Sequence, residues 1–331
     1  MVDDDILTRW IWPQKEDHIP SDSAYLDSFY DQDLNQVQKQ AVSDIVTPGH
    51  TIPYLISGPP GTGKTKTMVE SALQILRTDP KAKILLSAPS NAAADTLVRR
   101  LKAHLPPQQL FRLNSDKRTF AEVPQTILPY CFVENDKFGL PPIKELMKFR
   151  IVVTTCSDSA TITKAKVTNF HIQVAKEHVE KHLYFYPERL PATLFWTHLL
   201  IDEAAQASEP ETLAAIEVVL PAFSDVRPTL VLCGDRHQCK SPYHCFVICA
   251  DLQWDLLSPL DWPERAVSTS RFLNDYSPPA LIPTSRLLET TTEPVPAPTW
   301  SKITDPCLLS SWLHPVSSTT IHSSPLPRMY D

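Results

Sequence analysis

The sequence feature that most restricts the fold is a glycine-rich segment, GPPGTGKT, at residues 58–65. It follows a short apolar run, PYLIS, and precedes a stretch with an apolar stripe at helical spacing, formed by Val69, Ala72, Leu73 and Leu76. The segment satisfies the pattern G-x-x-x-x-G-K-[ST] in the required order of strand, turn and helix. Glycines let the backbone curl so that its N–H groups and the N-terminus of the next helix face phosphate groups. The feature therefore predicts a P-loop α/β domain that binds a nucleotide.

The positions of this loop have different expected tasks. Lys64 is expected to reach the β- and γ-phosphates, and Thr65 is expected to ligate Mg²⁺. The bare pattern arises by chance in roughly one chain of this length in a hundred, so the flanking strand and helix carry the assignment. The expected nucleotide-binding residues are Gly58, Pro59, Pro60, Gly61, Thr62, Gly63, Lys64, Thr65 and Thr67.

A second segment, HLLIDE, ends an apolar run in two carboxylates. Asp202 is expected to hold the Mg²⁺ shell, and Glu203 is expected to act as the general base that activates water. Strands ending in Asp-Glu are common in α/β proteins, so the assignment of this pair depends on the glycine-rich loop upstream. Downstream, Ser208 and Glu211 form a capping box with Pro210 in the first turn, which predicts a helix and not a catalytic group.

Apolar runs alternate with helical patterns along residues 34–238, which predicts one α/β domain. The runs PYLIS, KILLSA, LFRL, RIVVTT, HLLID and TLVLC are apolar on both faces, as in a parallel sheet with helices on each side. Two stretches interrupt the alternation, near 115–149 and 157–197, and we interpret them as insertions. The second contains an expected helix around HIQVAKEHVEKHL.

Composition indicates that the ends of the chain differ from this domain. The 331 residues include 32 prolines but 6 glycines, and the last glycine is Gly234. Residues 239–331 are rich in Pro, Ser and Thr, so we expect a disordered tail. Residues 1–33 are expected to form an irregular acidic leader.

Cysteine usage and net charge bear on the cellular compartment of the protein and on whether it binds nucleic acid. Seven irregularly spaced cysteines without a signal peptide predict a cytoplasmic protein, with the nucleus as the alternative, and no membrane span is expected. The net charge of −7 is a weak argument against nucleic-acid binding. A basic cluster is present at Arg99, Arg100 and Lys102, although on charge alone it is better explained as a solvated helix face.

Five segments, in order, resemble one family: LNQVQ, GPPGTGKT, SAPSNAAAD, DEAAQ and GDRHQ. This is the pattern of the Upf-like superfamily 1 helicases. Within that group VVTTC, DEAAQASEPETL and the RLN segment at Arg112 are most similar to the Armitage/silencing-defective RNA helicases. The resemblance spans residues 34–238 and implies the first RecA-like domain of such a helicase, with ATP and Mg²⁺ as cofactors.

The resemblance also implies roles for single residues. Gln38 resembles the glutamine that reads the adenine of ATP, although by itself it would be a helix-surface residue. Gln206 and Gln238 resemble γ-phosphate sensors, and the amide suits that role because it can both donate and accept hydrogen bonds. Asp235 resembles the acidic residue that couples ATP to the strand. Three residues resemble contacts to the nucleic-acid backbone, namely Ser90, Asn91 and Thr155; the first two also have the sequence of a helix cap.

The resemblance breaks after Gln238, where the family continues with Leu-x-Pro and this chain with Cys-Lys-Ser-Pro. We interpret the break as truncation after motif III, through a frameshift, retained intron or truncated gene model. A missing second RecA-like domain would remove an arginine finger worth roughly 10³ to 10⁵ in rate, so we expect ATP·Mg binding with little turnover.

The function implied is an ATP-dependent RNA helicase core that acts on single-stranded RNA, with RNA silencing or turnover proteins as partners by family alone. Two alternatives stay open: a DNA-directed relative, and a non-catalytic fragment that binds nucleotide or RNA.

Overall fold

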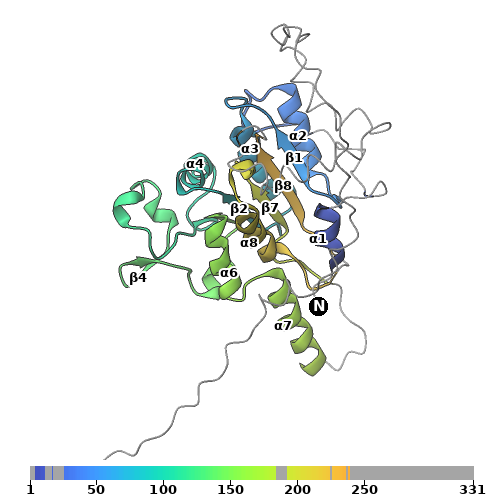
Figure 1. Ribbon diagram of the computed structural model, residues 1–331, viewed down its shortest axis with the longest axis vertical. Coiled ribbons are helices and arrows are strands. Elements are labelled where there is room, and N and C mark those ends of the chain that lie inside the picture. Colours follow the sequence, from blue (N-terminus) through green and yellow to red (C-terminus); the bar gives the residue numbers. More distant parts are fainter. Residues whose placement is uncertain are drawn as a thin grey trace, which may run out of the picture. The chain divides into compact units, whose positions relative to one another are not determined.

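The computed structural model describes residues 4–11, 17, 26–183, 192–223, 226–235 and 238. Its centre is a six-stranded parallel sheet (Figure 1). The strands lie in the order β1 (Tyr54–Ser57), β8 (Thr229–Gly234), β7 (His198–Ile201), β2 (Ile84–Ala88), β6 (Ile151–Thr155) and β3 (Leu110–Arg112). The expected parallel α/β fold is confirmed. The tail expected over 239–331 lies outside the described residues.

The central strands are apolar on both faces because both faces are covered. Successive side chains of a strand point to opposite sides. In β2, Leu85 accordingly joins one hydrophobic cluster while Ile84 and Leu86 join the other. In β6, Val152 and Val153 divide in the same way. This division explains the continuous apolar runs that the sequence shows at each strand.

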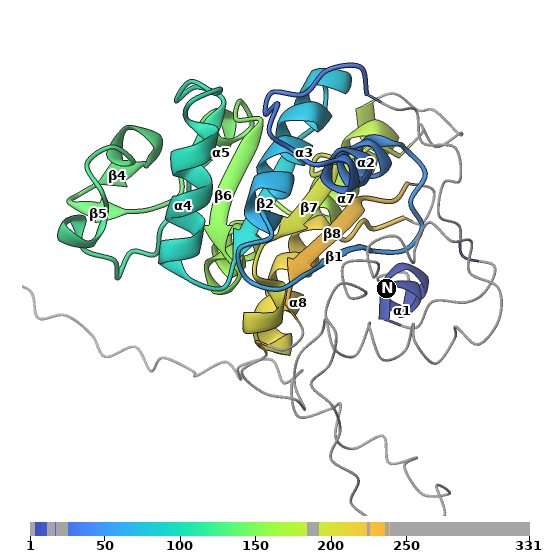
Figure 2. The same ribbon diagram turned by 90° about the horizontal axis from the view of Figure 1, so that it is seen from above.

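Helices cover both faces of the sheet. Figure 2 shows α3 (Lys64–Thr78) and α4 (Asn91–Leu101) along one face, where Met68 and Leu97 are fully buried. Also in the structure are α2 (Gln36–Val46), which packs on α3, and α5 (Ile143–Leu146). The other hydrophobic cluster includes Ala215 and Ile216 of α8 (Glu209–Val219) and Ile162 of α6 (Ala160–Lys164).

The leader differs from the expected irregular segment. Residues Asp4–Ile11 form helix α1, and its Ile6 and Trp10 are buried in the same cluster as α8. Their spacing of four puts both side chains on one helical face. Further along, Glu70 of α3 accepts hydrogen bonds from the backbone N–H groups of Tyr30 and Asp31, at 2.9 and 3.0 Å. The acidic leader therefore contains a short amphipathic helix, and its segment at Tyr30 and Asp31 is held against α3.

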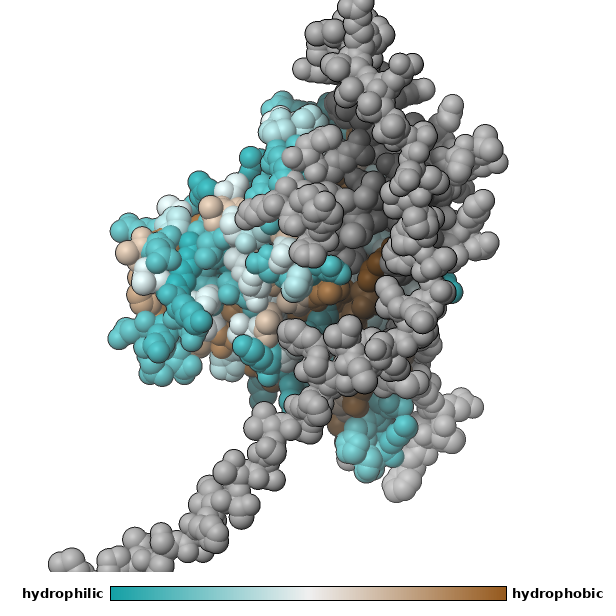
Figure 3. All heavy atoms as spheres, in the orientation of Figure 1, coloured by the Kyte–Doolittle hydropathy of each residue, from teal (hydrophilic) through white to brown (hydrophobic). Residues whose placement is uncertain are grey.

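Both expected insertions contain short elements of their own. In the first, β4 (Val133–Glu134) and β5 (Lys137–Phe138) form a hairpin. Its turn residues, Asn135 and Asp136, have φ of 52° and 58°, as the favoured tight hairpin turns require. The second contains α7 (Asn169–Leu183), which confirms the expected helix. The end of α7 at the bottom of Figure 3 is hydrophilic, in keeping with its exposed Lys181 and His182.

His198, at the start of β7, gives the fold a pH dependence. Burial lowers the pKa of its imidazole to about 4, from 6.5, against the opposing charge of Asp79. As the pH falls from 6.5 toward about 4, the unfolded chain binds a proton at His198 that the folded chain does not, so stability is lost. We expect the loss between pH 7 and pH 5, measured by urea unfolding, to shrink by about 1–2 kcal/mol in a His198→Asn variant. An unchanged pH dependence in that variant would contradict the assignment.

Candidate nucleotide site

The glycine-rich loop joins β1 to α3 at the carboxyl edge of the sheet. Gly61 and Gly63 have φ of 81° and 84°, in the left-handed region that favours glycine. At Gly63 a Cβ would also lie 2.5 Å from Nε2 of Gln38. The Thr62 hydroxyl donates to the Pro59 carbonyl at 2.8 Å and closes the turn. These two glycines are therefore required by backbone geometry as well as by the expected phosphate contacts.

Lys64 folds back across this loop. Its Nζ donates to the carbonyl oxygens of Gly58 and Pro59, at 2.8 and 3.2 Å. The residue is 8% exposed, and within the described part of the chain it forms no ion pair. A largely buried ammonium held by neutral carbonyls fits an anionic ligand, because an opposite charge would offset the cost of burial.

Asp202 lies directly after β7 and is 2% exposed. Its carboxylate accepts a hydrogen bond from the backbone N–H of Glu203 at 3.0 Å. Burial raises the pKa of Asp202, although the nearby Thr65 hydroxyl, the Glu203 N–H, the Cys233 thiol and the charge of Lys64 oppose the rise. The Thr65 hydroxyl and the Asp202 carboxylate are neighbouring hard oxygen donors, so they fit Mg²⁺.

Glu203 has a left-handed backbone, with φ of 53°, which is uncommon for a residue other than glycine. Its Oε2 accepts from Nε2 of Gln206 at 3.1 Å. The turn after it packs closely on β8, because a Cβ at Gly234 would lie 3.0 Å from the Ala205 nitrogen. Backbone strain of this kind persists only where the surrounding structure fixes it, and it is frequent at functional sites.

The remaining nucleotide-site residues lie around the loop. Gln38 belongs to the capping box of α2, and its Nε2 donates to the Thr62 carbonyl at 2.9 Å. It therefore contacts the loop and is not a free helix-surface residue. Nε2 of Gln238 donates to the Asp235 carboxylate at 3.0 Å. Thr67 is 2% exposed and donates to the Gly63 carbonyl at 3.3 Å, so its hydroxyl is engaged within α3.

The three residues expected to contact nucleic acid lie at the same edge of the sheet. Ser90 caps α4, accepting from the Ala93 N–H at 3.2 Å, so the helix-cap interpretation is confirmed. Asn91 is partly exposed at the first residue of that helix. Thr155 pairs with Ala88 across β2 and β6, is 6% exposed, and accepts from the Asp158 N–H at 3.0 Å. Of the three, Thr155 is the least accessible.

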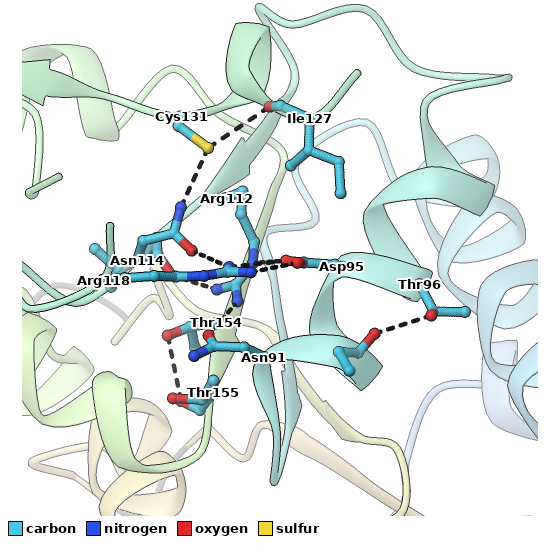
Figure 4. A network of polar contacts seen from close by, with 12 residues as sticks. Asn91, Asp95, Thr96, Arg112, Asn114, Arg118, Ile127, Cys131, Thr154 and Thr155 are labelled. Carbon is cyan, nitrogen blue, oxygen red and sulfur yellow. Dashed lines mark hydrogen bonds and ion pairs between the residues drawn. The ribbon is translucent and has the colours of Figure 1, made fainter. Parts of the chain in front are cut away.

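Beside these residues lies a buried polar network that the sequence did not predict (Figure 4). Asp95 of α4, 4% exposed, accepts from Arg112 of β3 and from Arg118 of the first insertion. Arg112 is fully buried and also donates to Asn91 at 2.8 Å. The sequence held one signal of this network, because Asp95 interrupts the apolar stripe of a helix.

In the described residues we find no cluster of His, Cys, Asp and Glu suited to a metal, and no helix long and apolar enough to span a membrane.

Comparison with known proteins agrees with this geometry. Residues 33–132 match the family model described as "AAA domain". The chain is 35% identical over 235 residues to RNA helicase Mov10l1 of Homo sapiens, covering 70% of this chain and 16% of the relative. It is 35% identical over 213 residues to Putative helicase MOV-10 of Gallus gallus, covering 62% and 20%. It is 32% identical over 247 residues to Probable RNA helicase armi of Drosophila melanogaster, covering 69% and 19%.

The chain thus spans a fifth or less of the length of these curated relatives. The five motifs, the parallel sheet and the relatives nevertheless agree with one another. Together they show that the chain contains a P-loop α/β domain similar to that of the helicases Mov10l1, MOV-10 and armi, in agreement with the resemblance to the Upf-like superfamily 1 helicases of the Armitage group.

Proposed function

We propose that this domain binds ATP with Mg²⁺ and couples its hydrolysis to a single strand of RNA. The observation that carries the proposal is that the phosphate loop, with the largely buried Lys64 folded across it, lies beside the buried Asp202 at the end of β7. Both lie at the carboxyl edge of the sheet, where parallel α/β proteins bind their ligands. Ser90 and Asn91 follow β2 at that same edge.

The roles follow from the chemistry of each group. Lys64 would bind the β- and γ-phosphates, while Thr65 and Asp202 would hold Mg²⁺. Bound Mg²⁺ would supply the positive charge that neutralises the phosphate oxygens. Glu203 would accept the proton of the attacking water, in exchange for its present hydrogen bond from Gln206. Gln206 and Gln238 would contact the γ-phosphate, and Gln38 the adenine.

RNA is proposed over DNA because two of the relatives carry the words "RNA helicase" in their names. Silencing or RNA-turnover proteins are proposed as partners from the family resemblance alone, and the cysteine usage supports the cytosol as the location. A contact to the ribose 2′-hydroxyl is what would distinguish RNA from DNA of the same sequence.

The proposal is tested by ATP turnover with no nucleic acid, with single-stranded RNA, and with DNA of the same sequence. All rates are expected to be low, in keeping with the little turnover that the sequence predicts, but RNA is expected to raise the basal rate more than DNA does. The Glu203→Gln variant is expected to lose about 100-fold or more of the stimulated rate, because it lacks the general base, while it still binds ATP·Mg. Equal rates in the variant and the unaltered protein would refute the role of Glu203. Equal stimulation by DNA would favour the DNA-directed alternative, and RNA binding without stimulation would favour the non-catalytic one.

A further inference from the structure

The side chain of Asn91 is held in one orientation by a fully buried neighbour. A guanidinium has five N–H donors and no acceptor. Nη2 of Arg112 lies 2.8 Å from Oδ1 of Asn91, so the amide oxygen has to face Arg112. The amide Nδ2, which is a donor, therefore points to the opposite side. No described residue accepts a hydrogen bond from it, and Asn91 is partly exposed.

We propose that Arg112 is a positioning residue, which fixes the Asn91 amide so that its Nδ2 donates to an acceptor oxygen of the bound RNA strand. This inference rests on the proposed function, because it assumes that the strand passes the N-terminus of α4. An amide free to rotate would also present its oxygen to the strand, and that oxygen would repel a phosphate. Fixing the amide avoids this loss without adding a positive charge at the surface.

Arg112 is itself fixed by its other hydrogen bonds (Figure 4). Its Nε donates to Asp95 Oδ1 at 3.1 Å and its Nη1 donates to the Leu113 carbonyl. Three nitrogens of one planar group thus bind three separate acceptors, and the guanidinium cannot turn without breaking at least one contact. Asn91 and Asp95 are four residues apart on α4, so they lie on one helical face and both reach the arginine.

Burying the charge of Arg112 costs free energy, which indicates that the residue has a role beyond stabilising the fold. Burial lowers the pKa of Arg112, and the charge of Asp95 offsets only part of that effect. Apolar residues often replace buried ion pairs without loss of stability, so stability alone is a weak reason for such a charge. A lysine could supply the charge but has no planar fork with which to hold Asp95 and Asn91 together.

Arg118 provides a matched control within the same network. It donates to both carboxylate oxygens of Asp95, at 3.1 and 2.6 Å, and to Asn114 at 2.7 Å. No hydrogen bond joins it to Asn91 in the described part of the chain. A lysine at either arginine therefore disturbs Asp95, but only the change at Arg112 releases the amide of Asn91.

The experiment measures three quantities for each variant of the full chain: affinity for a labelled single-stranded RNA, affinity for ATP·Mg, and melting temperature. Arg112→Lys is expected to weaken RNA binding roughly tenfold, the loss of about one hydrogen bond to a charged acceptor. Arg118→Lys is expected to lower the melting temperature as much as Arg112→Lys does, but to keep RNA affinity within about twofold of the unaltered protein. Neither variant should change the affinity for ATP·Mg. In an Asn91→Ala background, Arg112→Lys should cause no further loss, because the two residues act as one unit.

Asn91→Asp tests the same idea without touching the arginines. The carboxylate still accepts from Arg112, so the melting temperature should not fall, but the outward donor is lost and RNA binding should weaken at least tenfold. Equal loss of RNA affinity in the two lysine variants, additive losses in the double variant, or full RNA binding by Asn91→Asp would each overturn the inference while leaving the proposed function intact. If the unaltered protein binds ATP·Mg but no RNA, the proposed function and this inference fail together.

Discussion

Replacing Lys64 by alanine is expected to lower the affinity for ATP·Mg by about 100-fold or more. In a largely buried site, truncating one partner of a hydrogen-bonded charge pair costs about 2–5 kcal/mol. Among the described residues, the ammonium donates its hydrogen bonds to the neutral carbonyls of Gly58 and Pro59, so removing it should not unfold the domain. The binding measurement is the fluorescence of a labelled ATP analogue, with the melting temperature measured in parallel.

Lys66 offers the control for this change. It lies two residues further along α3 and pairs with Asp31 at 2.9 Å, in a partly exposed contact. Lys66→Ala should therefore leave nucleotide affinity within about twofold, since partly exposed ion pairs of this kind contribute little. Nearly unchanged affinity after Lys64→Ala, or an equal loss from both variants, would show that the loop does not bind the triphosphate as proposed.

Replacing Asp95 by asparagine is expected to destabilise the domain by about 3–5 kcal/mol, the usual effect of removing one partner of a buried ion pair. Asp95 is the acceptor for both Arg112 and Arg118, and without its charge two largely buried guanidinium groups are left uncompensated. Burial raises the pKa of Asp95, but hydrogen bonds and charges from the two arginines outweigh burial and lower it overall. Its contribution is thus present above the ordinary value of 3.8 and is lost as the pH falls through the lower, folded value.

Urea unfolding at neutral pH measures this effect, and an exposed ion pair serves as control. Glu145 and Lys148 lie 2.7 Å apart, with side chains 54% and 65% exposed. Glu145→Gln should change the free energy of unfolding by about 0–1 kcal/mol. If Asp95→Asn were no more destabilising than this control, the buried network would have no structural importance.

The strands and the loop could be predicted from the sequence because their signals are local. β2 and β6 each begin with three consecutive apolar residues, and the glycines of the loop stand between a strand and a helix. The order of the strands could not be predicted. β1 pairs with β8 and β7 with β2, although long segments separate them in the chain, and periodicity says nothing about which strands become neighbours.

The residues of the site likewise fall into those that the sequence could predict and those that depend on tertiary packing. Lys64 and Asp202 belong to motifs whose spacing carries their chemistry, so they could be named in advance. The position of the Cys233 thiol near Asp202 could not, because it depends on how β8 packs beside β7. The bond between Arg112 and Asn91 joins residues 21 positions apart and depends on the packing of α4 on β3. Helix α1 was missed because it is only 8 residues long and begins with two aspartates, so its two buried apolar residues give little periodic signal.

The central claim is that the loop at residues 58–65 and Asp202 form one site for a nucleotide with its metal. Calorimetric titration of ATP into the Glu203→Gln protein, with Mg²⁺ and with a chelator, tests it most directly. The account predicts binding at one site that weakens at least about tenfold without Mg²⁺, and an Asp202→Asn change that removes this dependence on the metal. No heat of binding, or equal affinity with and without Mg²⁺, would contradict it.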